Sequence, residues 1–93
     1  MPISAFYKAA QEDVQISTTH ISLYFALLHQ WMAGKCVNPF QIKRASIMQT
    51  ARISSRFTFN KGMWLLHDSG YIKYIPSHNP EIDSMVCLVQ LPE

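Results

Sequence analysis

The sequence predicts a small α+β fold in which a three-helix core packs against a small antiparallel sheet. Residues 42–91 follow the order strand, short helix, turn, longer helix and hairpin. Ahead of them, residues 17–34 contain one long apolar stretch with N-cap residues at its start and a glycine at its end. A length of 93 residues with 48% hydrophobic content is enough for one core.

The first long helix is expected from residue 17 to about Gly34. Its N-cap candidates are Ser17, Thr18 and Thr19. Apolar residues cover most of its surface, so we expect this helix to be largely buried. Its narrow polar side holds Ser22, Ala26, His29 and Gln30. Residues 1–16 carry little pattern, and we expect a weakly ordered segment or a short helix there, ahead of a folded domain of residues 17–93.

A short strand and a short helix are expected next. The strand comprises Phe40–Lys43, after a loop in which Pro39 cannot continue a helix. The short helix covers about Ala45–Ala51 and turns Ile47 and Met48 inward. Ile53 follows in the turn, where one buried apolar side chain holds two helices at their angle.

The longer helix begins with Ser54 or Ser55 as its N-cap and extends to Ser69, before Gly70. Projected at about 100° per residue, it has two faces. The face expected on the core comprises Thr58, Phe59, Gly62, Met63, Leu65 and Leu66. The opposite, outward face comprises Arg56, Phe57, Asn60, Lys61, Trp64 and Asp68. Because glycine has no side chain, Gly62 would let this helix approach a neighbour closely.

A hairpin is expected after Gly70. Its strands would be residues 71–75, with Tyr71 and Tyr74 in the core, and residues 85–89. The connecting segment, residues 76–84, is rich in turn-forming residues. The complete order is that of a winged helix-turn-helix, in which the β-hairpin is the wing.

Basic residues are concentrated in the second half of the chain. The net charge of the whole chain is only +2. Residues 43–80, however, hold six Lys or Arg residues against the single acid Asp68, a net of +5, and the remainder carries a net of −3. Such segregation is expected where a protein meets phosphates on one face. The alternative is that these are ordinary solvated surface charges.

The outward face of the longer helix carries residue types that suit DNA recognition. Arginine pairs with guanine and asparagine with adenine, so we assign base readout to Arg56 and Asn60. Phosphate contact and positioning are assigned to Arg44, Arg52, Ser54, Ser55, Lys61, Lys73 and His78. In the alternative interpretation, Arg56 and Asn60 are plain solvated helix residues.

Two aromatic residues, Phe57 and Trp64, lie on the same outward face and are too apolar for a simple major-groove helix. Three interpretations stay open. The rings pack inside the domain, they anchor a protein partner, or they contact DNA, where Phe57 would meet thymine methyl groups.

The sequence offers little for catalysis, metal binding or a membrane. It contains no GxSxG motif, no phosphate-binding glycine loop and no histidine pair spaced three or four residues apart. We therefore expect no enzyme activity, no cofactor and no metal, and we expect Cys36 and Cys87 to be reduced and partly buried. No apolar run approaches the roughly 18 residues of a membrane span, and no secretory signal is evident, so the expected location is the cytoplasm.

The chain resembles bacterial winged-helix proteins of the MarR-like regulator and replication-initiator kind, and most of all small winged-helix proteins of mobile elements. The resemblance covers about residues 17–91. It rests on Thr18 to Tyr24, Ile42-Lys43-Arg44, Ile47-Met48, Ile53-Ser54-Ser55, Thr58-Phe59-Asn60-Lys61, Leu66 and Gly70-Tyr71-Ile72-Lys73-Tyr74. What it implies is DNA binding by the helix from Ser54 to Ser69, with support from the wing.

These observations together predict sequence-selective binding of double-stranded DNA, by a transcriptional regulator or a mobile-element accessory factor. The alternative is a winged-helix module for protein–protein interaction that uses Phe57 and Trp64. A domain of this size is marginal as a monomer, which leaves open a homodimer or a neighbouring domain outside these residues.

Overall fold

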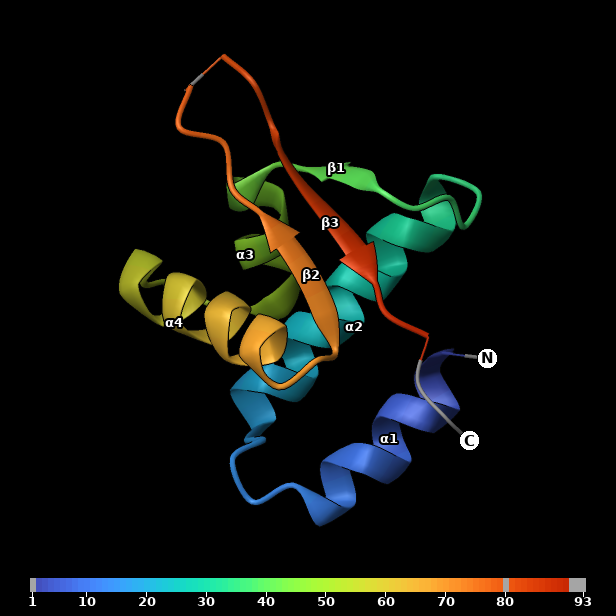
Figure 1. Cartoon of the computed structure of the whole chain (residues 1–93). Coiled ribbons are helices and arrows are strands. Elements are labelled where there is room, and N and C mark those ends of the chain that lie inside the picture. Colours follow the sequence, from blue (N-terminus) through green and yellow to red (C-terminus); the bar gives the residue numbers. More distant parts are fainter. Residues whose placement is uncertain (1, 80, 91–93) are drawn as a thin grey trace.

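The computed structural model describes residues 2–79 and 81–90, and within them the chain forms four helices and a three-stranded antiparallel sheet (Figure 1). The helices are α1 (Pro2–Glu12), α2 (Thr18–Ala33), α3 (Arg44–Ala51) and α4 (Arg56–Asp68). The strands are β1 (Phe40–Ile42), β2 (Ile72–Ile75) and β3 (Ser84–Leu88). The predicted α+β class is confirmed.

The ends of α4 lie where the capping residues predict them. The Ser55 hydroxyl accepts a hydrogen bond from the Thr58 N–H at 3.3 Å, so Ser55, rather than Ser54, is the N-cap. At the other end, Gly70 has a φ of +85°. The Tyr71 N–H donates to the Leu66 carbonyl at 3.0 Å across this glycine. This left-handed glycine with its long return bond stops the helix and turns the chain into β2.

The strand order is β1-β3-β2, with β3 in the centre. Phe40 and Tyr74 both pair with Val86, one from each side. Strands β1 and β2 are each one residue shorter than predicted, for local reasons, and β3 is shifted by one residue toward the N-terminus. Lys43 leaves β1 because it is the N-cap of α3, and Tyr71 stays outside β2 because its N–H closes the end of α4.

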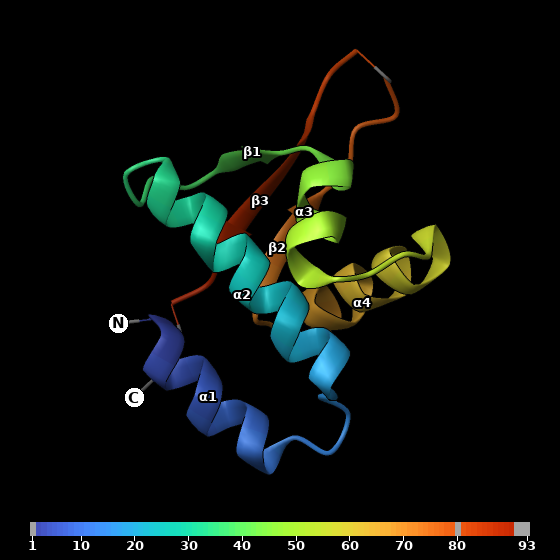
Figure 2. The same ribbon diagram turned by 180° about the vertical axis from the view of Figure 1, so that it is seen from behind.

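Helix α2 lies between α1 on one side and the α3–α4 pair on the other, as Figures 1 and 2 both show. The core between the helices and the sheet contains Leu23, Tyr24, Leu27, Phe59, Met63, Leu66, Ile72 and Val86, all essentially inaccessible to solvent. Tyr71 and Tyr74 are also buried, as predicted. The turn residue Ile53 is buried between α3 and α4.

The narrow polar side predicted for α2 is exposed only at its C-terminal end, where His29 and Gln30 lie, and its N-terminal part is covered. Ala26 is buried, and the Ser22 hydroxyl, one turn earlier, donates to the carbonyl of Ala51 at 2.7 Å. This N-terminal part therefore packs against α3 rather than facing water. Small side chains at these positions allow the two helices to approach, and the hydroxyl satisfies a carbonyl at the end of α3.

The N-terminal segment, expected to be weakly ordered or a short helix, is the 11-residue helix α1. Its Phe6 side chain is fully buried. The Phe6 ring stacks on the Tyr24 ring with a centroid distance of 3.7 Å, and it meets the Tyr71 ring edge-on at 5.3 Å. Helix α1 thus contributes to the same core as α2 and the sheet.

Candidate nucleic-acid interface

The structure separates the two faces of α4 as the sequence predicts. Phe59, Gly62, Met63 and Leu66 are buried, and Thr58 and Leu65 are half-buried. The outward residues Arg56, Phe57, Asn60, Lys61, Trp64 and Asp68 are all exposed. A Cβ atom at position 62 would lie 2.9 Å from Leu23 Cδ2, so glycine there is what permits the close approach of α4 to α2.

The charges on this outward face are available to a partner. In the part of the chain that the structure describes, the one ion pair joins Lys43 to Asp83, with 3.4 Å between Nζ and Oδ2. Arg56 and Lys61 therefore have no described carboxylate within ion-pair distance. No local pattern could indicate the Lys43 contact, because it joins positions that are 40 residues apart.

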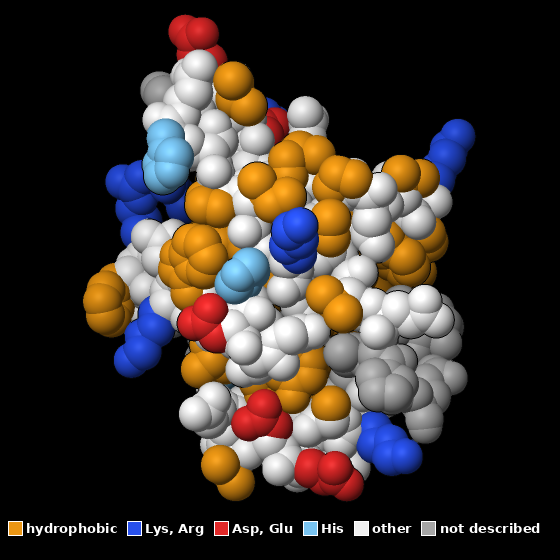
Figure 3. Space-filling model, viewed as in Figure 1, with side chains coloured by type: hydrophobic (Ala, Val, Ile, Leu, Met, Phe, Trp, Pro, Cys, Tyr) orange, Lys and Arg blue, Asp and Glu red, His pale blue; other side chains and the backbone are white. Residues whose placement is uncertain are grey.

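Further basic and hydroxyl groups flank the N-terminal end of α4. Arg44 is the first residue of α3, and Arg52 lies between the two helices; both are exposed. Arg52 has a φ of +61°, a left-handed conformation that favours glycine. Ser54 and Ser55 are exposed in the same turn. Figure 3 shows Lys and Arg side chains on the side of the molecule where α3 and this end of α4 lie.

The wing is not basic, although the sequence count placed its first half, up to residue 80, in the basic segment. His78 is exposed in the turn between β2 and β3, as expected. Glu81 and Asp83 belong to the same turn, and acidic side chains stand at the tip of the hairpin in Figure 3. The end of the basic segment and the acidic residues that follow position 80 thus lie in the same hairpin. The positive surface therefore belongs to α3 and α4 rather than to the wing.

Lys73 lies away from the outward face of α4. Successive residues of a strand point to opposite faces, and Tyr74 is buried on the face that packs against α4. Lys73 is exposed on the other face, opposite Cys87 on β3. The structure therefore brings Arg56, Asn60 and Lys61 together on one helix face, with Arg44, Arg52, Ser54 and Ser55 beside it, and leaves Lys73 on a different surface.

The two outward aromatic residues have different surroundings. The Trp64 ring lies edge-on to the Tyr74 ring at 5.1 Å and to the His67 ring at 5.2 Å, and the side chain is 41% exposed. Phe57 is 74% exposed and makes no aromatic contact with a described residue. Contacts within the domain thus cover much of the Trp64 ring, whereas they leave most of the Phe57 ring uncovered.

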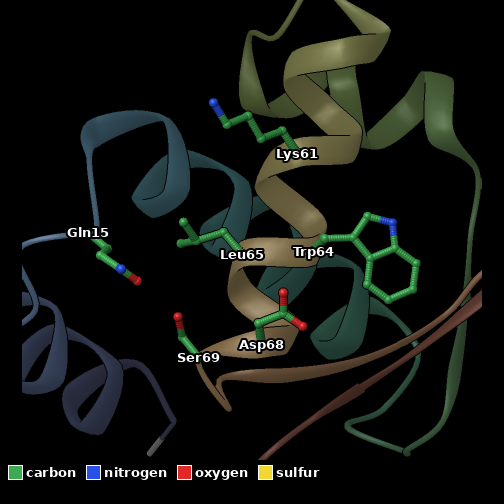
Figure 4. A pocket seen from close by; sticks show the side chains of 6 residues that line it. All are labelled: Gln15, Lys61, Trp64, Leu65, Asp68 and Ser69. Carbon is green, nitrogen blue, oxygen red and sulfur yellow. The ribbon is translucent and has the colours of Figure 1, made fainter.

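A shallow hollow, open to solvent, lies on the side of α4 that faces the segment between α1 and α2 (Figure 4). It is lined by Gln15, Lys61, Trp64, Leu65, Asp68 and Ser69. Leu65 points toward Gln15, and the Trp64 indole points to the other side of the helix. The lining offers one amine and one carboxylate, and it borders the outward face at Lys61.

His20 is the titratable group with a shifted pKa nearest to this face. Burial lowers its pKa, Asp13 acts in the opposite direction, and the positive charge of Lys61 lowers it further. Its Nδ1 atom accepts a hydrogen bond from the Ser17 N–H at 3.0 Å at the start of α2. The neutral ring, which alone has this acceptor, is therefore favoured.

The two cysteines differ in exposure. Cys87 is half-buried as expected, but Cys36 is exposed, because it lies in the tight turn after α2 with a φ of +61°. Among the described residues, no group of three or more His, Cys, Asp or Glu side chains could hold a metal ion. None of the described helices is both long and apolar enough to cross a membrane.

Comparison of the chain with protein-family models, with curated proteins and with solved structures found no match. The resemblance to winged-helix regulators and initiators therefore stays a prediction from the sequence pattern.

Proposed function

We propose that this chain is a winged helix-turn-helix protein that binds double-stranded DNA, with α4 in the major groove. The arrangement of α3, a short turn, α4 and the β2–β3 hairpin supports this fold family. The observation that carries the proposal is the outward face of α4, which exposes Arg56, Asn60 and Lys61 together without a described acidic partner.

Each group on this surface has a role that its chemistry suits. Arg56 donates two hydrogen bonds to a guanine, and Asn60 pairs with an adenine. Lys61, Arg44 and Arg52 neutralise phosphates on either side of the groove. The Ser55 hydroxyl accepts from the Thr58 N–H, and the backbone N–H groups of Arg56 and Phe57, which have no acceptor within the helix, favour a phosphate oxygen at the same end of α4.

The wing has a smaller role in this proposal than the sequence predicted. Its tip carries Glu81 as well as His78, and Lys43 is occupied by Asp83. Acidic groups repel phosphates, so most of the affinity is assigned to α3 and α4. The biological role that we attach to this binding is that of a transcriptional regulator or a mobile-element accessory factor.

The proposal is tested by fluorescence anisotropy of a labelled random-sequence duplex at about 50 and 200 mM salt. Neutralisation of about three to five phosphates gives a slope between about −2.7 and −4.5 when log affinity is plotted against log salt. Replacing Arg56 and Lys61 together by alanine should weaken binding and make the slope shallower by about 0.9, because Lys61 is the one of the two that is assigned to a phosphate.

The matched control carries Lys8→Ala and Lys35→Ala, which removes the same charge from α1 and from the turn after α2. It should keep the slope of the wild type. Absence of binding at low salt, or equal effects of the two double variants, would contradict the assignment of the interface to α4.

The exposed Phe57 ring favours a second candidate function, a winged-helix module that binds another protein through the outward face of α4. Salt separates the two functions, because an apolar contact weakens little as ionic strength rises, whereas phosphate binding weakens steeply.

A further inference from the structure

Phe57 is the most exposed aromatic side chain in the described part of the chain, at 74%. The fold does not need it, because Phe59, two residues later, supplies the buried aromatic ring of α4. Trp64, seven residues after Phe57 on the same helix, is covered on one side by Tyr74 of β2. A ring held in water at the beginning of the helix gains little from the fold and is free to bury its surface against a partner.

The position of Phe57 around the helix fixes what it would meet in the DNA complex. At about 100° per residue, Asn60 lies about 60° to one side of Phe57 and Lys61 about 40° to the other. Any approach that brings Asn60 and Lys61 to the edges of base pairs therefore brings the Phe57 ring between them. The ring would face the floor of the groove rather than the phosphates.

The major groove offers one apolar group on its floor, the C5-methyl group of thymine. Cytosine carries the same group when it is methylated at C5. A purely apolar protein partner is disfavoured, because it would strip water from the adjacent charges of Arg56 and Lys61 without compensating them.

We propose that Phe57 packs against the C5-methyl group of a pyrimidine and gives the protein a preference for thymine or 5-methylcytosine at that position. This inference rests on the DNA binding proposed above and names a specificity-determining residue of that same site.

The test begins with a duplex that the wild-type protein selects from a random pool. Each thymine of this duplex is then replaced in turn by deoxyuridine, which lacks only the methyl group. At one or two adjacent positions the replacement should weaken binding about fourfold, the effect of leaving one methyl group exposed. At all other positions the dissociation constant should stay unchanged.

The variant Phe57→Ala should bind the thymine and deoxyuridine duplexes equally well at the sensitive positions. Tyr7→Ala, which removes another exposed ring on α1, is the control and should keep the fourfold difference. Thermal unfolding of Phe57→Ala should match that of the wild type, since the side chain lies outside the core.

The possible outcomes separate this inference from the proposed function. Failure to retain any duplex of the random pool refutes DNA binding and the inference with it, whereas binding of the pool without selection of a sequence overturns only the inference. A selected duplex that tolerates deoxyuridine at every position, or a Phe57→Ala variant that keeps the difference, overturns only the inference.

A third arm places 5-methylcytosine, and separately cytosine, at the sensitive position. Tighter binding of the 5-methylcytosine duplex than of the thymine duplex identifies methylated DNA as the target. Tighter binding of the thymine duplex identifies ordinary DNA rich in that base at the site.

Discussion

The side-chain amide of Asn38 forms two hydrogen bonds with the backbone of Leu88 at the end of β3. Its Nδ2 donates to the Leu88 carbonyl and its Oδ1 accepts from the Leu88 N–H, both at 3.1 Å. The side chain thus continues the pairing of β1 with β3 beyond Phe40, in a loop that has no strand of its own. This contact fixes the position of the loop between α2 and β1.

Replacing Asn38 with alanine should destabilise the fold by about 2 kcal/mol, because both backbone groups of Leu88 lose their partner in a partly buried place. Urea unfolding measures this change. Asn79→Ala, in the hairpin turn, removes only a local bond to the Glu81 N–H and should cost less than about 0.5 kcal/mol. Equal losses of unfolding free energy for the two variants would show that the Asn38 hydrogen bonds to Leu88 contribute no more to stability than a local turn bond.

Arg52 has an unfavourable backbone conformation and is also proposed to contact a phosphate. It occupies the left-handed position after α3, and the Ile53 N–H donates to the Met48 carbonyl across it at 2.9 Å. Arg52→Gly should therefore raise stability by about 1 kcal/mol, equivalent to a rise in Tm of about 4–8 °C for a domain of this size. The same variant should weaken DNA binding and make its salt slope shallower by about 0.9. A gain in stability without a change in binding would remove Arg52 from the interface.

Stability should fall when the pH drops below about 6.5, the ordinary pKa of histidine. The folded chain lowers the pKa of His20, chiefly by burial, so the neutral ring is favoured in the fold and protonation favours the unfolded state. The contribution is present above pH 6.5 and is lost as the pH falls through the lowered pKa. Protonation also removes the acceptor for the Ser17 N–H.

The control for this pH dependence is His20→Gln, since glutamine at the third position of a helix can accept the same capping bond without titrating. The difference in unfolding free energy between the two proteins should change between pH 7 and pH 5. A constant difference across that range would show that His20 is not responsible.

Alkaline pH should also destabilise the fold, through Tyr71. Burial, together with the hydrogen bond that its hydroxyl donates to Asp13 Oδ2 at 2.9 Å, raises the pKa of Tyr71 from 10.0 to about 12. The protonated phenol is favoured in the fold, so its contribution is complete below pH 10 and is lost as the pH rises toward 12. Tyr71→Phe should show a smaller loss between pH 9 and pH 11.5 in urea titrations. Buried Tyr24, whose pKa burial also raises to about 12, keeps part of the dependence in both proteins.

The elements after residue 17 were predictable because local signals define them. Apolar spacing separated the two faces of α4, and Ser55 and Gly70 marked its ends. The buried position of Gly62 against Leu23 was also foreseeable, since a glycine on an apolar helix face has few other uses.

What sequence reasoning missed depends on contacts between distant positions. Nothing near Phe6 indicates that its ring stacks on Tyr24, although Ala5, Ala9 and Ala10 provide the spacing of a helix that packs closely. The Lys43–Asp83 ion pair likewise joins the ends of β1 and β3. Charge counts along the chain could not show that the hairpin folds acidic residues back beside basic ones.

The hydrogen bond from the Tyr74 N–H to His67 Nδ1, at 3.0 Å, has a consequence for self-association. Strand β2 is an edge of the sheet, and an unpaired edge is a template on which another chain can add a strand. Here the His67 side chain of α4 accepts the hydrogen bond of one backbone N–H along that edge, so this donor is not free to pair with another strand. The opposite edge, β1, is only three residues long. Both ends of the sheet are therefore poor templates for amyloid-like growth, a protection that His67→Ala should weaken at the β2 edge.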